Sequence, residues 1–319
     1  MSDIETLWGT DELARNAMGG SELSRRALFD RLEPAERESV QIINSRVREI
    51  DPTRPTILWL HDLAEDPENA HLDDSIFRQR FAKLVFVSYW QFTTYQMRYG
   101  IRYDESAIIP HAIEPIFPDG APLAKPDKGP LRLIYHTTPH RGLELLAPTV
   151  DYLTEKGMKL HLDVYSSFAA YGWPQRDAPY EELFETIRNH KAMAYHGYQP
   201  NSVVRKALER AHIFAYPSIW KETACLAAIE AMAAGCAVVC PNYGALPETV
   251  SPFGITYHWN EDPEKHLVTF AGALTDVIRN YGALQSRLEN QQRVINSSHS
   301  WERRLPRWKA LIHEVTSRV

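Results

Sequence analysis

Two glutamates separated by seven residues lie in the stretch of sequence best suited to chemistry, residues 216–248. Glu222 is in a polar loop after the apolar run 213–215, and Glu230 is in an Ala-rich run, 225–234, that favours a helix. The start of a helix presents unpaired N–H groups and the positive end of the helix dipole, which attract anions. Carboxylates accept hydrogen bonds from sugar hydroxyls. The pattern therefore predicts a ligand with phosphate and hydroxyl groups, with one carboxylate on each side of the phosphate.

The elements that must position these glutamates alternate between strand and helix. Short apolar runs predict five strands, at 131–135, 160–164, 193–196, 213–215 and 237–240. The segments between them predict helices at 142–156, 180–190 and 202–210. This alternation predicts a parallel, doubly wound sheet, and the loop of Glu222 then falls at its carboxyl edge, where such sheets bind ligands.

The first part of the chain predicts a second, smaller α/β sheet. Its strands are expected at 4–8, 40–43, 56–60, 84–87 and 107–109. Gly19 and Gly20 precede a helical pattern at 23–32, and paired glycines let backbone approach a ligand closely. His61 follows the carboxyl end of the strand at 56–60. A plain turn is the alternative for the glycines, and a packing histidine is the alternative for His61.

The boundary between the two sheets is marked by composition. Five prolines stand in the segment 115–130, which has the composition of a linker. We expect a first domain at 1–117, a linker at 118–130 and a second domain at 131–300. Helices are expected at 264–281, 284–295 and 301–315, and the last of these, within 301–319, is expected to cross back to the first domain.

Composition narrows the class of protein. The 319 residues are 44% hydrophobic and 24% charged, which is typical of a globular protein. The sequence has neither an apolar run long enough to span a bilayer nor a signal peptide at its start, so we expect a cytoplasmic protein. Cys225, Cys236 and Cys240 have no histidine at zinc-ligand spacing, which predicts buried, reduced thiols and no metal site.

A series of landmarks in order gives the chain a family resemblance. They are Val87-Ser88, the run from Ile109-Pro110-His111 to Phe117, Arg141-Gly142, Pro217-Ser218, Glu222 with Glu230, Gly244 to Glu248, and Ser300-Trp301. Together they resemble the retaining glycosyltransferases of family 4, whose signature is E-x7-E and whose GT-B fold has two Rossmann-like domains facing a cleft. The run YHTTPHRGLELL at 135–146 is most similar to glycosyltransferase-like proteins of tailed bacteriophages and some bacteria, which implies the host cytoplasm if the protein is encoded by a bacteriophage.

The resemblance implies a role for each candidate site residue. The catalytic group would be Glu222 at the donor sugar, His61 near the acceptor and Arg141 on the diphosphate. The donor-binding group would be Glu230 on the ribose, together with Gly19, Gly20, Thr138, Gly197, Ala224, Cys225 and Leu226. On this interpretation, alanine at Arg141 or Glu222 removes most turnover without disturbing the fold.

The sequence departs from the family pattern at two places. The family often has Gly-Arg five to six residues before the basic residue of its K-G pair, whereas this chain has Tyr135-His136 there. That change implies the loss of one cationic phosphate ligand. Cys225 stands where glycine is common, which narrows the space beside the donor sugar.

The implied reaction is transfer of a hexose or pentose, with retention, from a nucleotide-diphosphate sugar to a hydroxyl group, with no metal and no cofactor. The acceptor would be a glycan, a lipid-linked saccharide or a hydroxymethylated DNA base. The net charge of −6 arises in residues 1–117, where 13 Lys and Arg stand against 20 Asp and Glu, and this disfavours DNA. Two alternatives are a non-catalytic nucleotide-sugar binding module and a GT-B-type sugar epimerase. The sequence gives no indication of oligomeric state.

Overall fold

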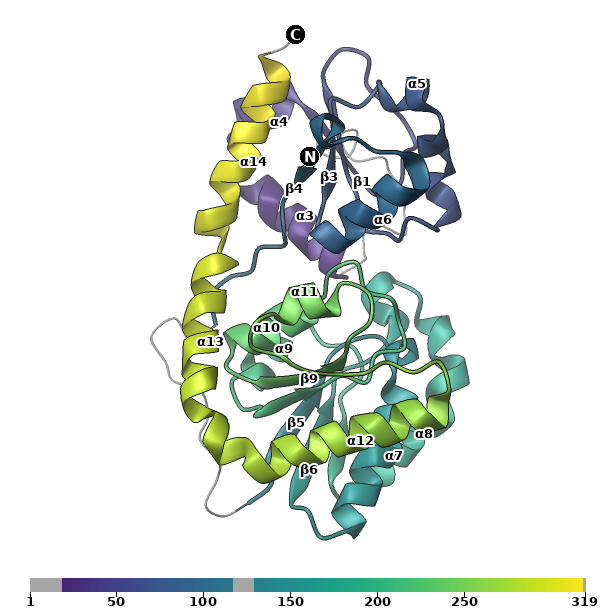
Figure 1. Ribbon diagram of the computed structural model, residues 1–319, viewed down its shortest axis with the longest axis vertical. Coiled ribbons are helices and arrows are strands. Elements are labelled where there is room, and N and C mark those ends of the chain that lie inside the picture. The colour runs from purple at the N-terminus through teal and green to yellow at the C-terminus, as the bar shows by residue number, and fades with distance from the viewer. Residues whose placement is uncertain (1–18, 117–128, 318–319) are drawn as a thin grey trace. The chain divides into compact units, whose positions relative to one another are not determined.

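The computed structural model describes residues 19–116 and 129–317, and the chain divides into two compact units (Figure 1). Unit 1 comprises Met1–Ile113 and His299–Val319, and unit 2 comprises Glu114–Ser298. The strand expected at 4–8 and nearly all of the expected linker, 118–130, lie outside the described residues. The chain therefore passes between the units twice, after Ile113 and after Ser298.

Unit 1 contains a four-stranded parallel sheet in the order β1-β2-β3-β4. The strands are β1 (Gln41–Asn44), β2 (Thr56–Trp59), β3 (Lys83–Phe86) and β4 (Ser106–Ile108). The four predicted strands that lie in the described residues are confirmed to within one residue at each end. Their apolar side chains are buried with those of the neighbouring helix α6, which explains why continuous apolar runs encode strands here. The helices are α3 (Gly20–Arg31), α4 (Pro34–Ser39), α5 (Ser75–Arg78) and α6 (Tyr89–Tyr99).

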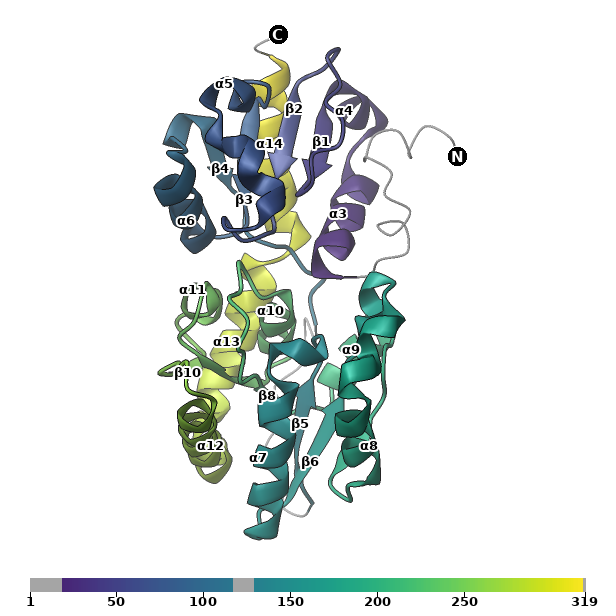
Figure 2. The same ribbon diagram turned by 90° about the vertical axis from the view of Figure 1, so that its right-hand side faces the viewer.

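The last helix, α14 (Trp301–Thr316), belongs to unit 1 (Figure 2). Its buried Trp308 packs edge-on against Trp59 of β2, with ring centroids 4.6 Å apart. An ion pair of 3.1 Å joins Lys309 to Glu36 in α4, and Arg307 donates to the carbonyl of Ile108 at 2.7 Å. Burial of the tryptophan supplies most of the attachment, because ion pairs near the surface contribute little.

Unit 2 contains a six-stranded parallel sheet in the order β10-β9-β8-β5-β6-β7. The strands are β5 (Leu131–Tyr135), β6 (Leu160–Val164), β7 (Met193–Tyr195), β8 (Ile213–Ala215), β9 (Ala237–Pro241) and β10 (Ile255–Tyr257). The five predicted strands are confirmed, three of them at both ends, whereas β10 was not predicted. From β5 the chain moves outward to β6 and β7, and it then returns to the other side of β5 for β8, β9 and β10. The order of the strands therefore reverses between β5 and β8.

Most helices of unit 2 fall into two groups by their contacts with one another. They are α7 (Leu143–Glu155), α8 (Glu181–Asn189), α9 (Asn201–Leu208), α10 (Leu226–Ala233), α11 (Leu246–Val250), α12 (Pro263–Asn280) and α13 (Gln285–Ser298). Helix α12 contacts α7, whereas α9, α11 and α13 contact α10. Such an arrangement matches the doubly wound architecture that the alternation of strands and helices predicted.

Candidate active site

The centre of unit 2 is the point where the strand order reverses, between the neighbouring strands β5 and β8. In open α/β sheets, ligands bind outside the carboxyl ends of the strands at such a point. The loop after β5 carries Thr138 and Arg141, and the loop after β8 carries Glu222. Three of the predicted site residues therefore meet at the position where topology alone places a ligand.

Arg141 and Glu222 form a buried ion pair at this point. Nη1 of Arg141 donates to Oε1 of Glu222, and Nε of Arg141 donates to the hydroxyl of Thr138 at 3.2 Å. The hydroxyl of Tyr216 donates to the same Oε1 at 2.5 Å. Glu222 is only 4% exposed. Burial acts to lower the pKa of Arg141, but the neighbouring Glu222 carboxylate outweighs it and holds that pKa well above its usual value, so the guanidinium keeps its charge.

Two glycines allow the loop of Glu222 to come this close to its neighbours. Gly142 has a φ of 116°, and a Cβ there would lie 2.1 Å from the carbonyl oxygen of Pro217. Gly244 has a φ of 59°, and its Cβ would lie 2.7 Å from the backbone oxygen of Glu222. Both the left-handed backbone and the close approach require glycine. The Arg-Gly and Gly-Ala-Leu-Pro-Glu landmarks thus position the carboxylate from two sides.

Glu230 lies in α10 and has a different set of partners. Its Oε1 accepts a hydrogen bond from Nδ2 of Asn201 at 3.2 Å and lies 3.4 Å from Nη1 of Arg205. Burial raises the pKa of this carboxyl group, and Arg205 opposes the rise. Arg205 also donates to the carbonyls of Glu114 and Pro115, at 3.0 and 2.9 Å. The two signature glutamates therefore stand in separate ion pairs. The prediction of a phosphate between the two carboxylates did not include these basic partners.

The sequence comparison decides the family. The family described as "Glycosyl transferases group 1" matches residues 124–294, more than half of the chain. The chain belongs to the group 1 glycosyltransferases. The match covers nearly all of unit 2, including both glutamates and Arg141. No curated protein sequence gives a significant match.

Solved structures of similar fold agree with the GT-B architecture. A glycosyltransferase from Rickettsia africae is 15% identical with a TM-score of 0.69, over 94% of this chain and 82% of that one. Sucrose-phosphate synthase from Thermosynechococcus elongatus is 16% identical with a TM-score of 0.65, over 88% and 74%. Anabaena HepE in complex with UDP-glucose is 14% identical with a TM-score of 0.64, over 93% and 82%. At these identities the likeness establishes the fold alone.

In this glycosyltransferase, helix α10 begins at Leu226, directly beside Glu222. Cys225 caps it in an extended conformation, with a φ of −109°, so this backbone does not require the glycine that is common in the family. The three cysteines are buried and free, which confirms the prediction of buried thiols. Burial raises the pKa of the Cys225 thiol well above its usual value. Ala224 and Leu226 are half-buried on either side of it.

The remaining predicted residues lie in two other places. Gly197 follows β7 in unit 2 with a φ of 61°. Gly19 caps α3 in unit 1, Gly20 is the first residue of that helix, and the amide of Leu23 donates to the carbonyl of Gly19 at 3.0 Å. His61 lies just after β2 and packs between Trp59 and His111, at ring distances of 4.7 and 5.4 Å. Burial lowers the pKa of His61 well below its usual value, so the imidazole is neutral.

His136, at the position where the family often has a cationic residue, carries no charge at neutral pH. Its ring packs on Phe214 with centroids 4.7 Å apart, and burial lowers its pKa to about 4. Arg141 is therefore the predicted cation that remains for binding a phosphate. Sequence reasoning missed Tyr216, Asn201 and Arg205 as partners of the glutamates, because nothing in the spacing of these residues relates them to Glu222 or Glu230.

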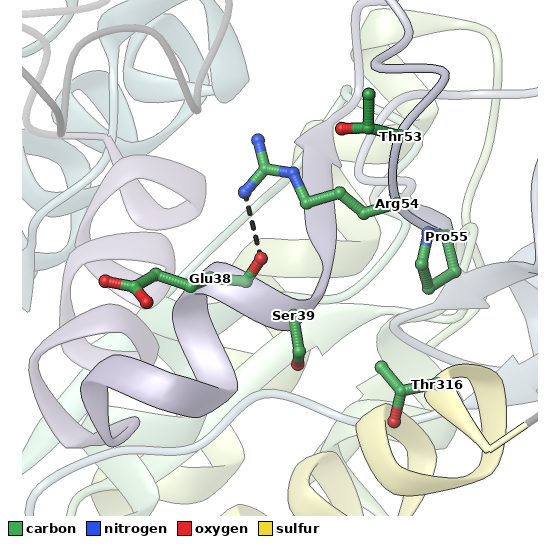
Figure 3. Close-up of a pocket in the computed structure, with 6 residues that line it drawn as sticks. All are labelled: Glu38, Ser39, Thr53, Arg54, Pro55 and Thr316. Carbon is green, nitrogen blue, oxygen red and sulfur yellow. Dashed lines mark hydrogen bonds between the residues drawn. The ribbon is translucent and has the colours of Figure 1, made fainter. Parts of the chain in front are cut away.

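A hollow of about 400 Å³ in unit 1 has no bearing on this site (Figure 3). Its lining residues are Glu38, Ser39, Thr53, Arg54, Pro55 and Thr316. Pro55 directly precedes β2, so the hollow lies at the amino end of the parallel strands, opposite the edge that binds ligands. Arg54 forms an ion pair with Asp51 and donates a hydrogen bond to the carbonyl of Glu38.

Among the described residues, no cluster of His, Cys, Asp or Glu side chains suits a metal ion, and no helix is long and apolar enough to span a bilayer.

Two buried histidines of unit 1 predict loss of stability in acid. Burial lowers the pKa of His111 and of His299 to about 4, against about 6.5 for an exposed histidine. Below pH 6.5 these two histidines bind protons in the unfolded chain but stay neutral in the native state. The free energy of unfolding therefore falls as the pH decreases toward 4. The full loss is roughly 3 kcal/mol for each histidine below pH 4, of which about 2 kcal/mol is expected between pH 7.5 and pH 5. Urea unfolding at pH 7.5 and pH 5 measures it, and His111→Asn should show a smaller difference between the two; an unchanged difference would contradict the assignment.

Proposed function

We propose that this glycosyltransferase moves a sugar, with retention of configuration, from a nucleotide-diphosphate sugar to an acceptor hydroxyl, using the site at the carboxyl ends of β5 and β8. The observation that carries the proposal is the Arg141–Glu222 pair at the point where the strand order reverses. A guanidinium binds phosphate oxygens with two parallel hydrogen bonds, and a carboxylate accepts from sugar hydroxyls. A nucleotide-diphosphate sugar presents phosphate oxygens and sugar hydroxyls side by side.

Donor binding must rearrange the ion pair. In the structure Glu222 occupies Nη1 of Arg141, so a diphosphate competes for that guanidinium and frees the carboxylate for the sugar. Tyr216 still donates to Glu222 and keeps the carboxylate in place during this exchange. Glu230, with its raised pKa and its partners Asn201 and Arg205, is assigned to the ribose hydroxyls. In unit 1, His61 is assigned to the acceptor side, and Gly19 and Gly20 are assigned to the donor diphosphate.

Catalysis in this proposal rests on charge. As the bond between sugar and diphosphate breaks, negative charge grows on the leaving group, where Arg141 and the backbone amides of Ala224, Cys225 and Leu226 stabilise it. The acceptor hydroxyl attacks the same face that the diphosphate leaves, which retains the configuration. The proposed reaction uses no metal ion and no cofactor.

The acceptor is proposed to be a saccharide, free or linked to a lipid. The resemblance to bacteriophage proteins keeps a hydroxymethylated DNA base as the alternative, which would have to be flipped out of the duplex. A low-salt gel shift with modified and unmodified duplexes separates the two, because binding to the DNA backbone depends steeply on salt. The acidic first 117 residues favour the saccharide.

Release of nucleoside diphosphate tests the function. The protein is incubated with UDP-glucose, GDP-mannose and ADP-glucose, with and without candidate saccharides and with excess chelator, and the diphosphate released is measured. UDP-glucose is tried first because the Anabaena protein of similar fold binds it. We expect chelator-resistant release from one donor, with the anomer of the donor retained in the product by proton NMR. Tight binding with no release from any donor would indicate a binding module, and an isomerised donor would indicate an epimerase.

A further inference from the structure

An exposed aromatic ring lies beside the Arg141–Glu222 pair, and it is not one of the residues assigned to the donor or the acceptor. Trp220 stands two residues before Glu222, and its side chain is 42% exposed. The guanidinium carbon of Arg141 lies 5.6 Å from the centre of the indole ring. The ring of His140 meets the indole edge-on, with centroids 4.9 Å apart and planes at 88°.

The start of the loop that carries Trp220 is held in place by its neighbours. Ser218 is fully buried, its hydroxyl accepts from the amide of Trp220 at 3.2 Å, and it donates to the carbonyl of Trp220 at 3.0 Å. Pro217 lies in close contact with Gly142, directly after Arg141. Behind the indole, His140 stacks on Phe168 at 5.1 Å with planes 15° apart. The exposed ring is therefore fixed in place before any ligand arrives.

If Trp220 only shielded the ion pair from water, contact of one ring face with Arg141 would be enough, and the rest of the ring would not need to be exposed. The large exposed remainder of Trp220 indicates a further partner, and the neighbourhood identifies its chemistry. The donor sugar is bonded to the phosphate that Arg141 is assigned to hold, so the sugar must come within reach of a ring that touches the same guanidinium. A pyranose has polar edges and an apolar C–H face. Glu222 offers an acceptor for the hydroxyls, and Trp220 offers an apolar surface for the face.

This inference rests on the proposed function. We propose that Trp220 is a specificity-determining residue that packs against the C–H face of the transferred sugar and selects a pyranose donor. The indole carries no charge, so we expect it to contribute little to the binding of the diphosphate. Trp220→Ala should therefore weaken binding of a nucleotide sugar while leaving binding of the matching nucleoside diphosphate almost unchanged.

Titration calorimetry of three matched pairs tests the proposal: UDP with UDP-glucose, GDP with GDP-mannose and ADP with ADP-glucose. For the pair that binds, we expect Trp220→Ala to weaken the sugar nucleotide about 10-fold, as loss of an aromatic contact typically does, and to change the diphosphate by less than about 2-fold. Trp220→Phe should recover part of the loss. Ile219→Ala is the matched control, because Ile219 is 46% exposed on the same loop, and it should change neither affinity.

Three results would overturn the proposal, and they differ from one another. Equal weakening of diphosphate and sugar nucleotide by Trp220→Ala would mean that the ring acts only through Arg141. No change in either affinity would mean that the ring does not touch the donor. If the wild-type protein binds none of the six compounds, the proposed function itself fails, and the role of Trp220 fails with it.

Discussion

Replacing Arg141 with methionine should lower turnover by about 100- to 1000-fold, the usual effect of removing one group that stabilises a developing charge. Methionine fills similar space without a charge, so the leaving diphosphate loses its main cation. Arg188→Met is the control, because Arg188 forms an exposed ion pair with Glu181 on α8 of the same unit. Turnover is measured as release of nucleoside diphosphate from the donor that the wild-type protein uses, and near-normal release by the variant would refute the assignment.

The same substitution should also destabilise the fold, contrary to the expectation from sequence. Arg141 is bound to a carboxylate that is 4% exposed, and breaking a buried pair on one side typically costs about 3 to 5 kcal/mol. The double variant Arg141→Met with Glu222→Gln removes both charges, so it should recover much of the free energy of unfolding while staying inactive. If the double variant were no more stable than Arg141→Met, the ion pair would not be the source of the loss.

Gly142→Ala should be the most damaging single-methyl change in the site. The added Cβ would lie 2.1 Å from the carbonyl oxygen of Pro217, in a backbone with a φ of 116°. We expect a loss of about 3 kcal/mol or more in the free energy of unfolding, from backbone strain and the displaced loop together. The loop that moves carries Glu222, so affinity for the donor should fall as well.

Gly157→Ala isolates the backbone strain, so its difference from Gly142→Ala gives the steric part of this effect. Gly157 also has a left-handed φ, of 85°, but its Cβ would meet no atom within 4 Å. Strain alone should cost roughly 1 to 2 kcal/mol there, with donor affinity unchanged. Urea unfolding of the two variants side by side gives the difference, and equal losses would show that the contact between Gly142 and Pro217 is not critical.

Local sequence signals predicted the strands of this protein well. The limits of β5, β6 and β8 agree with the predicted limits because the apolar residues of these strands are buried in the sheet. The strand β10 and the short helix α11 were missed. Each has only a few residues, with Thr256 exposed in the one and Pro247 in the first turn of the other, so neither has a clear period.

The partners of the site residues could not be predicted in the same way. Arg141 meets Glu222 only because β8 pairs with β5 after the chain has built two other strands. The contact between Arg205 and Glu230 depends on how α9 packs against α10. The sequence predicted which residues would carry chemistry, whereas the pairing of charges depends on contacts between segments far apart in the chain. Nothing in the sequence marked Trp220 as a site residue except its proximity to Glu222.

Titration calorimetry tests whether the donor nucleotide binds in unit 2 through Glu230 and Arg141. UDP, GDP, ADP and CDP are titrated into the wild-type protein and into Glu230→Gln, a variant of the same size whose side chain has no charge to offer the ribose hydroxyls. We expect one diphosphate to bind the wild-type protein and Glu230→Gln to weaken that binding about 10-fold or more, the loss expected for a hydrogen bond to a charged group. Equal affinity in the two proteins, or no binding of any diphosphate, would contradict this role of Glu230 and Arg141.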